Sequence, residues 1–101
     1  MYDIYMTYYS KKDYKFLGFR KSNKKDKMYY ALLENKKNLK LVRVHFGHNK
    51  YMNFRDITGL NAYPQLIHKD KERRKRFRAR QKGYLKDGYY SPSFFSYYYL
   101  W

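Results

Sequence analysis

The alternation of apolar and polar residues predicts a β-sheet in the first half of the chain. Residues 14–19 are rich in β-forming side chains, and residues 28–34 and 39–46 are apolar runs separated by a short loop with Asn at both ends. Two such runs around a short loop are typical of a β-hairpin. Alternation in the second run predicts one face with Val42, Val44 and Phe46, and an opposite face with Leu41, Arg43 and His45.

The second half of the chain has a different pattern. Residues 47–67 contain Gly, Asn and Pro at intervals that interrupt regular structure, and they predict a loop. Residues 68–82 contain no Gly, Pro or β-branched residue and predict a helix. Asp70 is expected in its first turn, where the helix dipole favours anions, and Gly83 is expected to end it. Phe77 is the only large apolar residue in this segment, so the helix should contact the core along one narrow stripe.

Both ends of the chain are rich in aromatic residues. Ser91 followed by Pro92 predicts a helix start, because Ser is a frequent N-cap and Pro fits the first helical position. Residues 91–101 are therefore expected to form a short aromatic helix with Phe94, Tyr97 or Tyr98, and Trp101 on one stripe, and a strand is the alternative. The residues assigned to packing or to an interface are Tyr2, Tyr5, Tyr8, Tyr9, Phe94, Phe95, Tyr97, Tyr98 and Trp101.

These elements predict a single α+β domain over residues 1–101. Its parts are an aromatic arm (1–13), a small antiparallel β-sheet based on a hairpin (14–46), a loop (47–67), a basic helix (68–82) and a short aromatic C-terminal helix (91–101). A chain of 101 residues suits one modest core. We expect no membrane span and no secretion signal, because no apolar run approaches the roughly 20 residues that a span needs and the first residues lack the signal pattern.

Charge gives the strongest indication of function. The chain has 24 Lys and Arg residues against 8 Asp and Glu residues, a net charge of +16. Because such an excess repels itself in a compact monomer, we expect a polyanionic partner, which could be nucleic acid, an acidic protein surface or an anionic lipid face. Nine cations and two acids give the predicted helix a net charge of +7. The cations assigned to polyanion binding are Lys69, Lys71, Arg73, Arg74, Lys75, Arg76, Arg78, Arg80 and Lys82.

The sequence does not indicate an enzyme. It has no cysteine, no Gly-rich phosphate loop and no nucleophile elbow. His45 and His48 lie at a predicted strand end without a nearby acidic ligand, so we expect neither a metal site nor another cofactor. A metal-dependent nuclease is disfavoured because the few acidic residues form no acid and His constellation.

Several short motifs follow one another in a set order along residues 22–101. They are a strand ending in His45-Phe46-Gly47, a basic helix opening with His68-Lys69-Asp70, and a terminal block from Ser91-Pro92 through Phe94-Phe95-Ser96 to Leu100-Trp101. This order resembles a family of small basic proteins encoded by nucleocytoplasmic large DNA viruses, which include giant and algal viruses. Gln81 stands where that family often has His, and residues 48–65 form a longer connector than the family's.

The resemblance implies a viral gene product and supplies no catalytic residue to transfer. We therefore expect a non-enzymatic minor structural protein of the virion, made in the host cytoplasm, that cements capsid proteins or bridges an acidic capsid surface to the genome. Its expected partners are other capsid or virion proteins. The alternative is a nucleic-acid-binding protein that condenses or contacts viral DNA or RNA through the basic helix.

Overall fold

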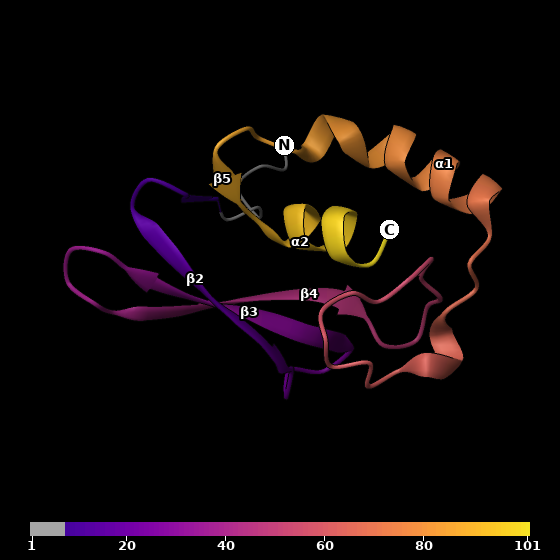
Figure 1. The fold of residues 1–101 in the computed structure, drawn as a ribbon, viewed down its shortest axis with the longest axis horizontal. Coiled ribbons are helices and arrows are strands. Elements are labelled where there is room, and N and C mark those ends of the chain that lie inside the picture. Colours follow the sequence, from indigo (N-terminus) through magenta and orange to yellow (C-terminus); the bar gives the residue numbers. More distant parts are fainter. Residues whose placement is uncertain (1–7) are drawn as a thin grey trace.

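The computed structural model describes residues 8–101 and confirms the α+β class (Figure 1). Its base is a three-stranded antiparallel sheet in the order β2-β3-β4. Strand β2 spans Tyr14–Lys21, β3 spans Lys27–Asn35 and β4 spans Leu41–His48. Strands β2 and β3 are longer than expected because pairing continues beyond the apolar residues, with Lys21 opposite Tyr29. Strand β4 has the expected length but begins and ends two residues later, and its last residue, His48, pairs with Lys27.

The predicted hairpin is confirmed as β3 and β4. Leu33 lies opposite Val42, and the Asn35 side-chain oxygen accepts hydrogen bonds from the backbone N–H groups of Lys37 (2.8 Å) and Asn38 (3.2 Å). An Asn side chain that accepts hydrogen bonds from the backbone N–H groups two and three residues further on takes the place of a backbone carbonyl in a turn. This is why the polar segment between the two apolar runs closes the hairpin.

The predicted faces of β4 are also confirmed. Val44 and Phe46 are buried, whereas the Leu41 side chain is 57% exposed. In β2 the alternation is interrupted, since a register shift between Phe16 and Gly18 lets Phe16 and Phe19 both contact the core. Gly18 has a φ of 125°, a backbone conformation that side-chain-bearing residues rarely adopt, so glycine is needed at this β-bulge.

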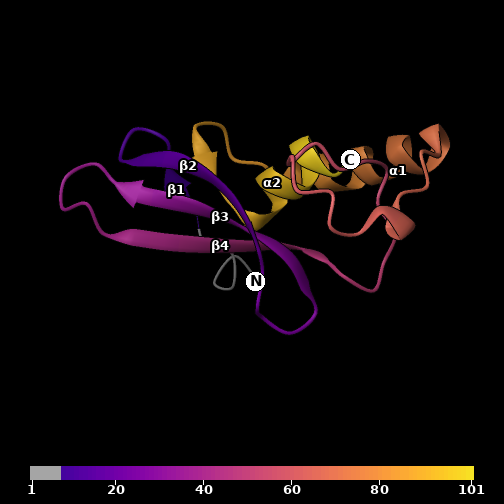
Figure 2. The ribbon, with the colours of Figure 1, turned by 60° about the horizontal axis from the view of Figure 1, so that its bottom comes forward.

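Two helices lie on the same side of the sheet, with α2 (Pro92–Tyr99) between the sheet and α1 (Lys71–Gln81) (Figures 1 and 2). The predicted start of α2 is confirmed, because the Ser91 hydroxyl accepts a hydrogen bond from the Phe94 N–H at 3.1 Å. The core forms where α2 meets the sheet. Its buried residues are Phe19, Met28, Tyr29, Ala31, Leu33, Val44, Phe46, Phe95, Leu100 and Trp101.

The predicted stripe on α2 is wrong. Phe95 is fully buried, with its ring centroid 5.5 Å from that of Phe46, whereas Phe94 packs against the exposed Tyr98 at 4.9 Å. The helix has only two turns and carries aromatic residues on several sides. Hydrophobic periodicity therefore does not show which side meets the sheet.

Helix α1 begins at Lys71, three residues later than expected. Lys69 has a φ of 57° and Asp70 is extended, so neither residue can belong to the helix. The Asp70 carboxylate instead caps it, accepting hydrogen bonds from the N–H groups of Glu72 (3.0 Å) and Arg73 (3.2 Å). The α-helix ends at Gln81, one residue before the expected end, and the chain continues through Gly83 as the 3-10 turn η3 (Lys82–Tyr84).

Two segments expected to be irregular pair with each other. Strand β1 (Tyr9–Ser10), from the expected arm, pairs with β5 (Tyr89–Tyr90), from the stretch between the helices, to form a second antiparallel sheet. The predicted loop 47–67 also contains the 3-10 turn η2 (Pro64–Leu66). The assigned residues Tyr2 and Tyr5 lie outside the described residues.

Candidate functional site

One side of α1 borders an open groove of about 540 Å³. Arg73, Arg76 and Arg80 are spaced by three and four residues, so they extend from the same side of the helix. All three are exposed. Together with residues of the β4–η2 loop and the C-terminal segment they form what we call the basic groove: Lys50, Tyr51, Met52, Arg73, Arg76, Phe77, Arg80 and Trp101.

The floor of the basic groove is aromatic. Phe77 and Trp101 stack almost parallel, with ring centroids 4.1 Å apart and planes at 7°. Trp101 is only 8% exposed, and Phe77 is half-buried. Phe77 is therefore the apolar contact of α1, as its isolation among cations predicted, and it presents an apolar surface beside the arginines.

The rest of the groove's lining comes from the loop after β4. Tyr51 is 68% exposed, and its ring stacks on the His48 imidazole at 4.3 Å and 24°. The imidazole is itself held, because its Nδ1 accepts a hydrogen bond from the Lys50 N–H at 3.1 Å. The Lys50 ammonium group lies 3.1 Å from the Asp26 carboxylate.

Lys50, Tyr51 and Met52 were not among the residues assigned from the sequence. They lie far from α1 along the chain, in a stretch predicted to be loop. A local signal does exist, since an apolar pair directly follows a cation in an otherwise polar segment. That signal does not show which helix the loop will face.

Arg74 and Arg78 lie on the side of α1 that faces α2. Arg74 Nε donates a hydrogen bond to the Trp101 carbonyl oxygen at 2.6 Å, and Arg78 Nη1 donates to the Tyr97 carbonyl at 3.2 Å. The last four carbonyls of a helix have no partner within the helix, and basic side chains can satisfy them. Arg78 therefore caps the C-terminal end of α2, whereas Arg74 holds Trp101, two residues beyond the helix.

The cap is completed by the loop before η2. Arg55 Nη2 donates to the Tyr98 carbonyl at 3.1 Å, and the Arg55 backbone N–H donates to the Leu100 carbonyl at 3.0 Å. Desolvation by burial, and then the nearby charge of Arg74, lowers the pKa of Arg55. Three arginines thus bond carbonyls of residues 97–101, two in the last turn of α2 and one just beyond it.

The other assigned cations surround the basic groove without lining it. Lys69 precedes α1, Lys71 and Lys75 are exposed on it, and Lys82 begins η3. Of the nine assigned cations, the structure brings Arg73, Arg76 and Arg80 together in the groove.

The assigned aromatic residues have different environments. Phe95 and Trp101 are buried, Phe94 and Tyr97 are half-buried, and Tyr98 is 43% exposed. Tyr9 lies in β1. The Tyr8 hydroxyl donates to the Tyr84 carbonyl at 3.3 Å.

The histidines of the described residues have structural contacts. The His68 Nδ1 accepts a hydrogen bond from the Asp70 N–H at 2.8 Å, and its ring lies 5.1 Å from that of Trp101. Burial, and then the charge of Arg73, lowers the pKa of His68. Burial also lowers the pKa of His45, whose Nδ1 lies 2.8 Å from the Ser22 hydroxyl. Within residues 8–101, no three His, Asp or Glu side chains are grouped so that they could hold a metal ion.

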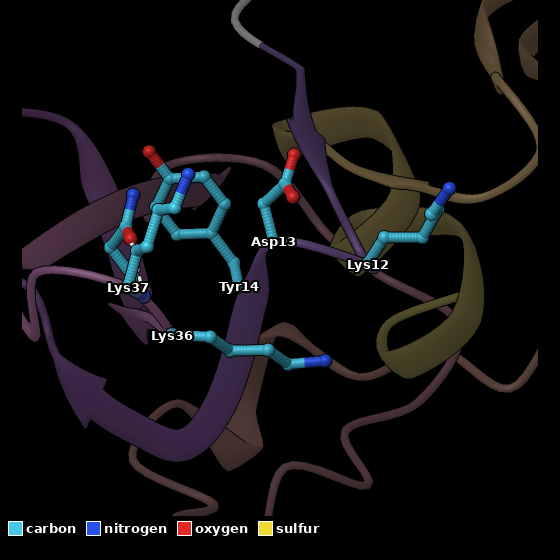
Figure 3. Close-up of a pocket in the computed structure, with 6 residues that line it drawn as sticks. Lys12, Asp13, Tyr14, Lys36 and Lys37 are labelled. Atoms are coloured by element: carbon cyan, nitrogen blue, oxygen red, sulfur yellow. Dashed lines mark hydrogen bonds between the residues drawn. The ribbon is translucent and has the colours of Figure 1, made fainter.

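A second cavity, of about 490 Å³, lies near the tip of the hairpin, at the other end of the molecule from the basic groove (Figures 1 and 3). Its lining includes Lys12, Asp13, Lys36 and Lys37. The Lys36 ammonium group donates to the Lys11 carbonyl at 3.3 Å. Figure 3 shows Lys12 extending away from Lys37, with the Asp13 carboxylate between them. Its cations do not converge, so the basic groove is the better candidate for binding an anion.

In the part of the chain that the structure describes, neither helix is long and apolar enough to cross a membrane. Comparison of the chain with family models, curated proteins and solved structures finds no match.

Proposed function

We propose that the protein is a non-enzymatic nucleic-acid-binding protein and that the basic groove is its binding site. The observation that carries the proposal is the convergence of Arg73, Arg76 and Arg80 on a groove that also presents exposed aromatic surface. Guanidinium groups form bidentate hydrogen bonds with phosphate. The net charge of +16 would attract a polyanion from a distance.

The aromatic content of the groove favours nucleic acid over an acidic protein surface. Carboxylates need only cations as partners, and the exposed lysines of α1 supply those outside the groove. The exposed Tyr51 ring and the half-buried Phe77 ring add apolar surface to the groove that the arginines line. Nucleic acids combine phosphates with flat bases, and proteins bind them with the same pairing of cations and aromatic rings.

The test is the salt dependence of binding to a labelled oligonucleotide, measured by fluorescence anisotropy. We expect log affinity to fall linearly with log salt concentration. Replacing Arg73, Arg76 and Arg80 together by Ala should weaken binding and make the slope shallower by about 2, since each lost phosphate contact contributes about 0.7. Alanine is a strong helix former, so α1 should persist.

A charge-matched control removes three cations outside the groove. Lys15, Lys25 and Lys40 are exposed, and none of them lines it. Their joint replacement by Ala changes the net charge equally and should retain most of the binding. Absence of binding by the unmodified protein at low salt refutes the proposal, and so does an equal loss in both triple variants.

A role as a minor virion protein is a second proposal, and the resemblance of its motif order to that of the viral family supports it. The structure changes how such a role would work, since Phe95, Trp101 and Tyr9 contribute to the protein's own packing. The remaining contact with a capsid surface would be the exposed cationic side of α1. Mass spectrometry of purified virus particles tests this role, which requires the protein at a fixed ratio to a capsid protein.

A further inference from the structure

We infer that the basic groove binds single-stranded nucleic acid and that Tyr51 is its base-stacking residue. This inference rests on the proposed function and specifies its ligand. It is argued from the fixed position of the Tyr51 ring, the apolar floor of the groove and the line of arginines beside it.

The Tyr51 ring is held in place before any ligand binds. One face stacks on the His48 imidazole, and the Tyr51 backbone N–H donates to the His48 carbonyl at 3.2 Å. The imidazole is anchored by the Lys50 N–H. Despite these contacts Tyr51 is 68% exposed. Within residues 8–101, no other large hydrophobic residue is as exposed. A fixed and exposed ring offers a stacking surface at a low entropic cost of ordering.

Packing within residues 8–101 does not account for an exposed aromatic ring at Tyr51. Other aromatic side chains, such as Phe46 and Phe95, are buried among neighbouring rings. Met52 beside it is 39% exposed. Together with the Phe77–Trp101 stack, these side chains give the groove an apolar surface that phosphates alone would not use.

The arginines are placed to follow a strand backbone along this surface. A helix rises about 1.5 Å per residue, so Arg73 and Arg80 are about 10 Å apart along the axis of α1. Arg76 lies between them on the same side. A strand lying along α1 could therefore place successive phosphates on the arginines while a base turns towards Tyr51.

The ligand must be single-stranded for this arrangement to be used. In a duplex the bases are stacked on one another inside the helix, so their faces cannot reach a protein ring. In a single strand every base has an accessible face, and aromatic stacking is tolerant of sequence. We therefore expect weak sequence preference and a clear preference for single strands.

The experiment compares three labelled or competing ligands: a 12-nucleotide oligothymidylate, a DNA duplex of the same length, and heparin as a polyanion without bases. Tyr51→Ala should weaken binding to the single strand about 10-fold or more. The affinity of the Tyr51→Ala variant for the duplex and for heparin should differ from that of the unmodified protein by less than about 2-fold. Tyr51→Phe, which retains the ring, should bind the single strand like the unmodified protein.

Tyr84→Ala is the matched control. Tyr84 is 53% exposed, lies in η3 and does not line the groove, and the contact that it makes with Tyr8 uses its backbone carbonyl. Circular dichroism before titration checks that each variant is folded. Equal effects of Tyr51→Ala and Tyr84→Ala, or equal binding to single strand and duplex, overturn the inference while leaving the proposed function intact. Failure of the unmodified protein to bind any nucleic acid overturns both.

Discussion

Tyr29 joins the sheet to the long loop through a single hydroxyl group. Its side chain is fully buried in β3, and its hydroxyl donates to Asp56 Oδ2 at 2.5 Å while accepting from the Ala62 N–H at 2.9 Å. The other Asp56 oxygen accepts from the backbone and hydroxyl groups of Thr58. One tyrosine hydroxyl therefore ties two positions of this loop, Asp56 and Ala62, to the sheet.

Tyr29→Phe should destabilise the fold by about 1–2 kcal/mol at pH 7, because it leaves the Ala62 N–H and the Asp56 carboxylate without their shared partner. Burial, and then the hydrogen bond to Asp56, raises the pKa of Tyr29 above its usual value of 10.0. Folding therefore favours the neutral phenol. Its contribution is fully present below pH 10 and is lost as the pH rises through the higher pKa of the folded state.

Urea unfolding of both proteins at several pH values measures this difference. The gap in unfolding free energy between the unmodified protein and the Tyr29→Phe variant should be constant from about pH 7 to 9 and should shrink above about pH 10. Taking the difference removes the contribution of lysines that titrate in the same range. A gap that widens above pH 10 contradicts the assignment.

At the scale of elements, local signals in the sequence predict which helix or strand forms. Contacts between residues that are distant in sequence determine where that element lies in the fold. The hairpin and the start of α2 were predictable, because Asn35 and Ser91 act on residues two or three positions away. The pairing of β1 with β5 was not, since two-residue strands carry no periodic pattern and Tyr9 meets Tyr90.

The same limit applies to the candidate site. The cationic helix was evident from the sequence, but its division into a groove side and a capping side was not. Arg73 and Arg74 are chemically identical neighbours, and only the position of α2 makes one of them line the groove and the other bond the Trp101 carbonyl. Tyr51 enters the site because the loop after β4 reaches α1.

This division predicts opposite effects for the two neighbours. Arg74→Ala should lower the free energy of unfolding by about 1–2 kcal/mol, because the carbonyl of the buried Trp101 loses a charged donor. Arg73→Ala should change stability by less than about 0.5 kcal/mol, because its side chain is exposed on the surface of α1. In oligonucleotide binding the order should reverse, so that Arg73→Ala weakens binding more than Arg74→Ala does.

Chemical denaturation and fluorescence anisotropy check both expectations on three proteins: the unmodified protein, Arg73→Ala and Arg74→Ala. Because each variant removes one arginine and adds one alanine in the same helix, changes in net charge and helix propensity cancel between them. Equal stabilities for the two variants would contradict the role of Arg74 in holding Trp101.

For the whole molecule, charge opposes the folded state. Across residues 8–101, the ion pair that the structure shows is Lys50–Asp26, which joins exposed and half-buried side chains and contributes little to stability. The net charge of +16 is therefore mostly uncompensated within the fold. The aromatic core must hold the chain together against this repulsion.

Salt should consequently have opposite effects on folding and on binding. Raising sodium chloride from about 20 mM to 500 mM shortens the screening distance from tens of ångströms to a few, so the repulsion weakens and the melting temperature should rise. Nucleic-acid affinity should fall over the same range. Thermal melts followed by circular dichroism, without and with an oligonucleotide, measure both effects, and a melting temperature that falls with salt in the free protein would contradict the argument.

The middle position of α2 also bears on how the chain folds during synthesis. The sheet residues are made before α2, yet side chains that cover Phe19 and Phe46 come from Phe95 and Tyr99 of that helix. Until α2 is made, the part of the sheet that it covers is exposed, and β2 and β4 are open edges. The nascent protein therefore passes through a stage with exposed aromatic surface, which favours aggregation at high expression levels and makes a chaperone useful during its production.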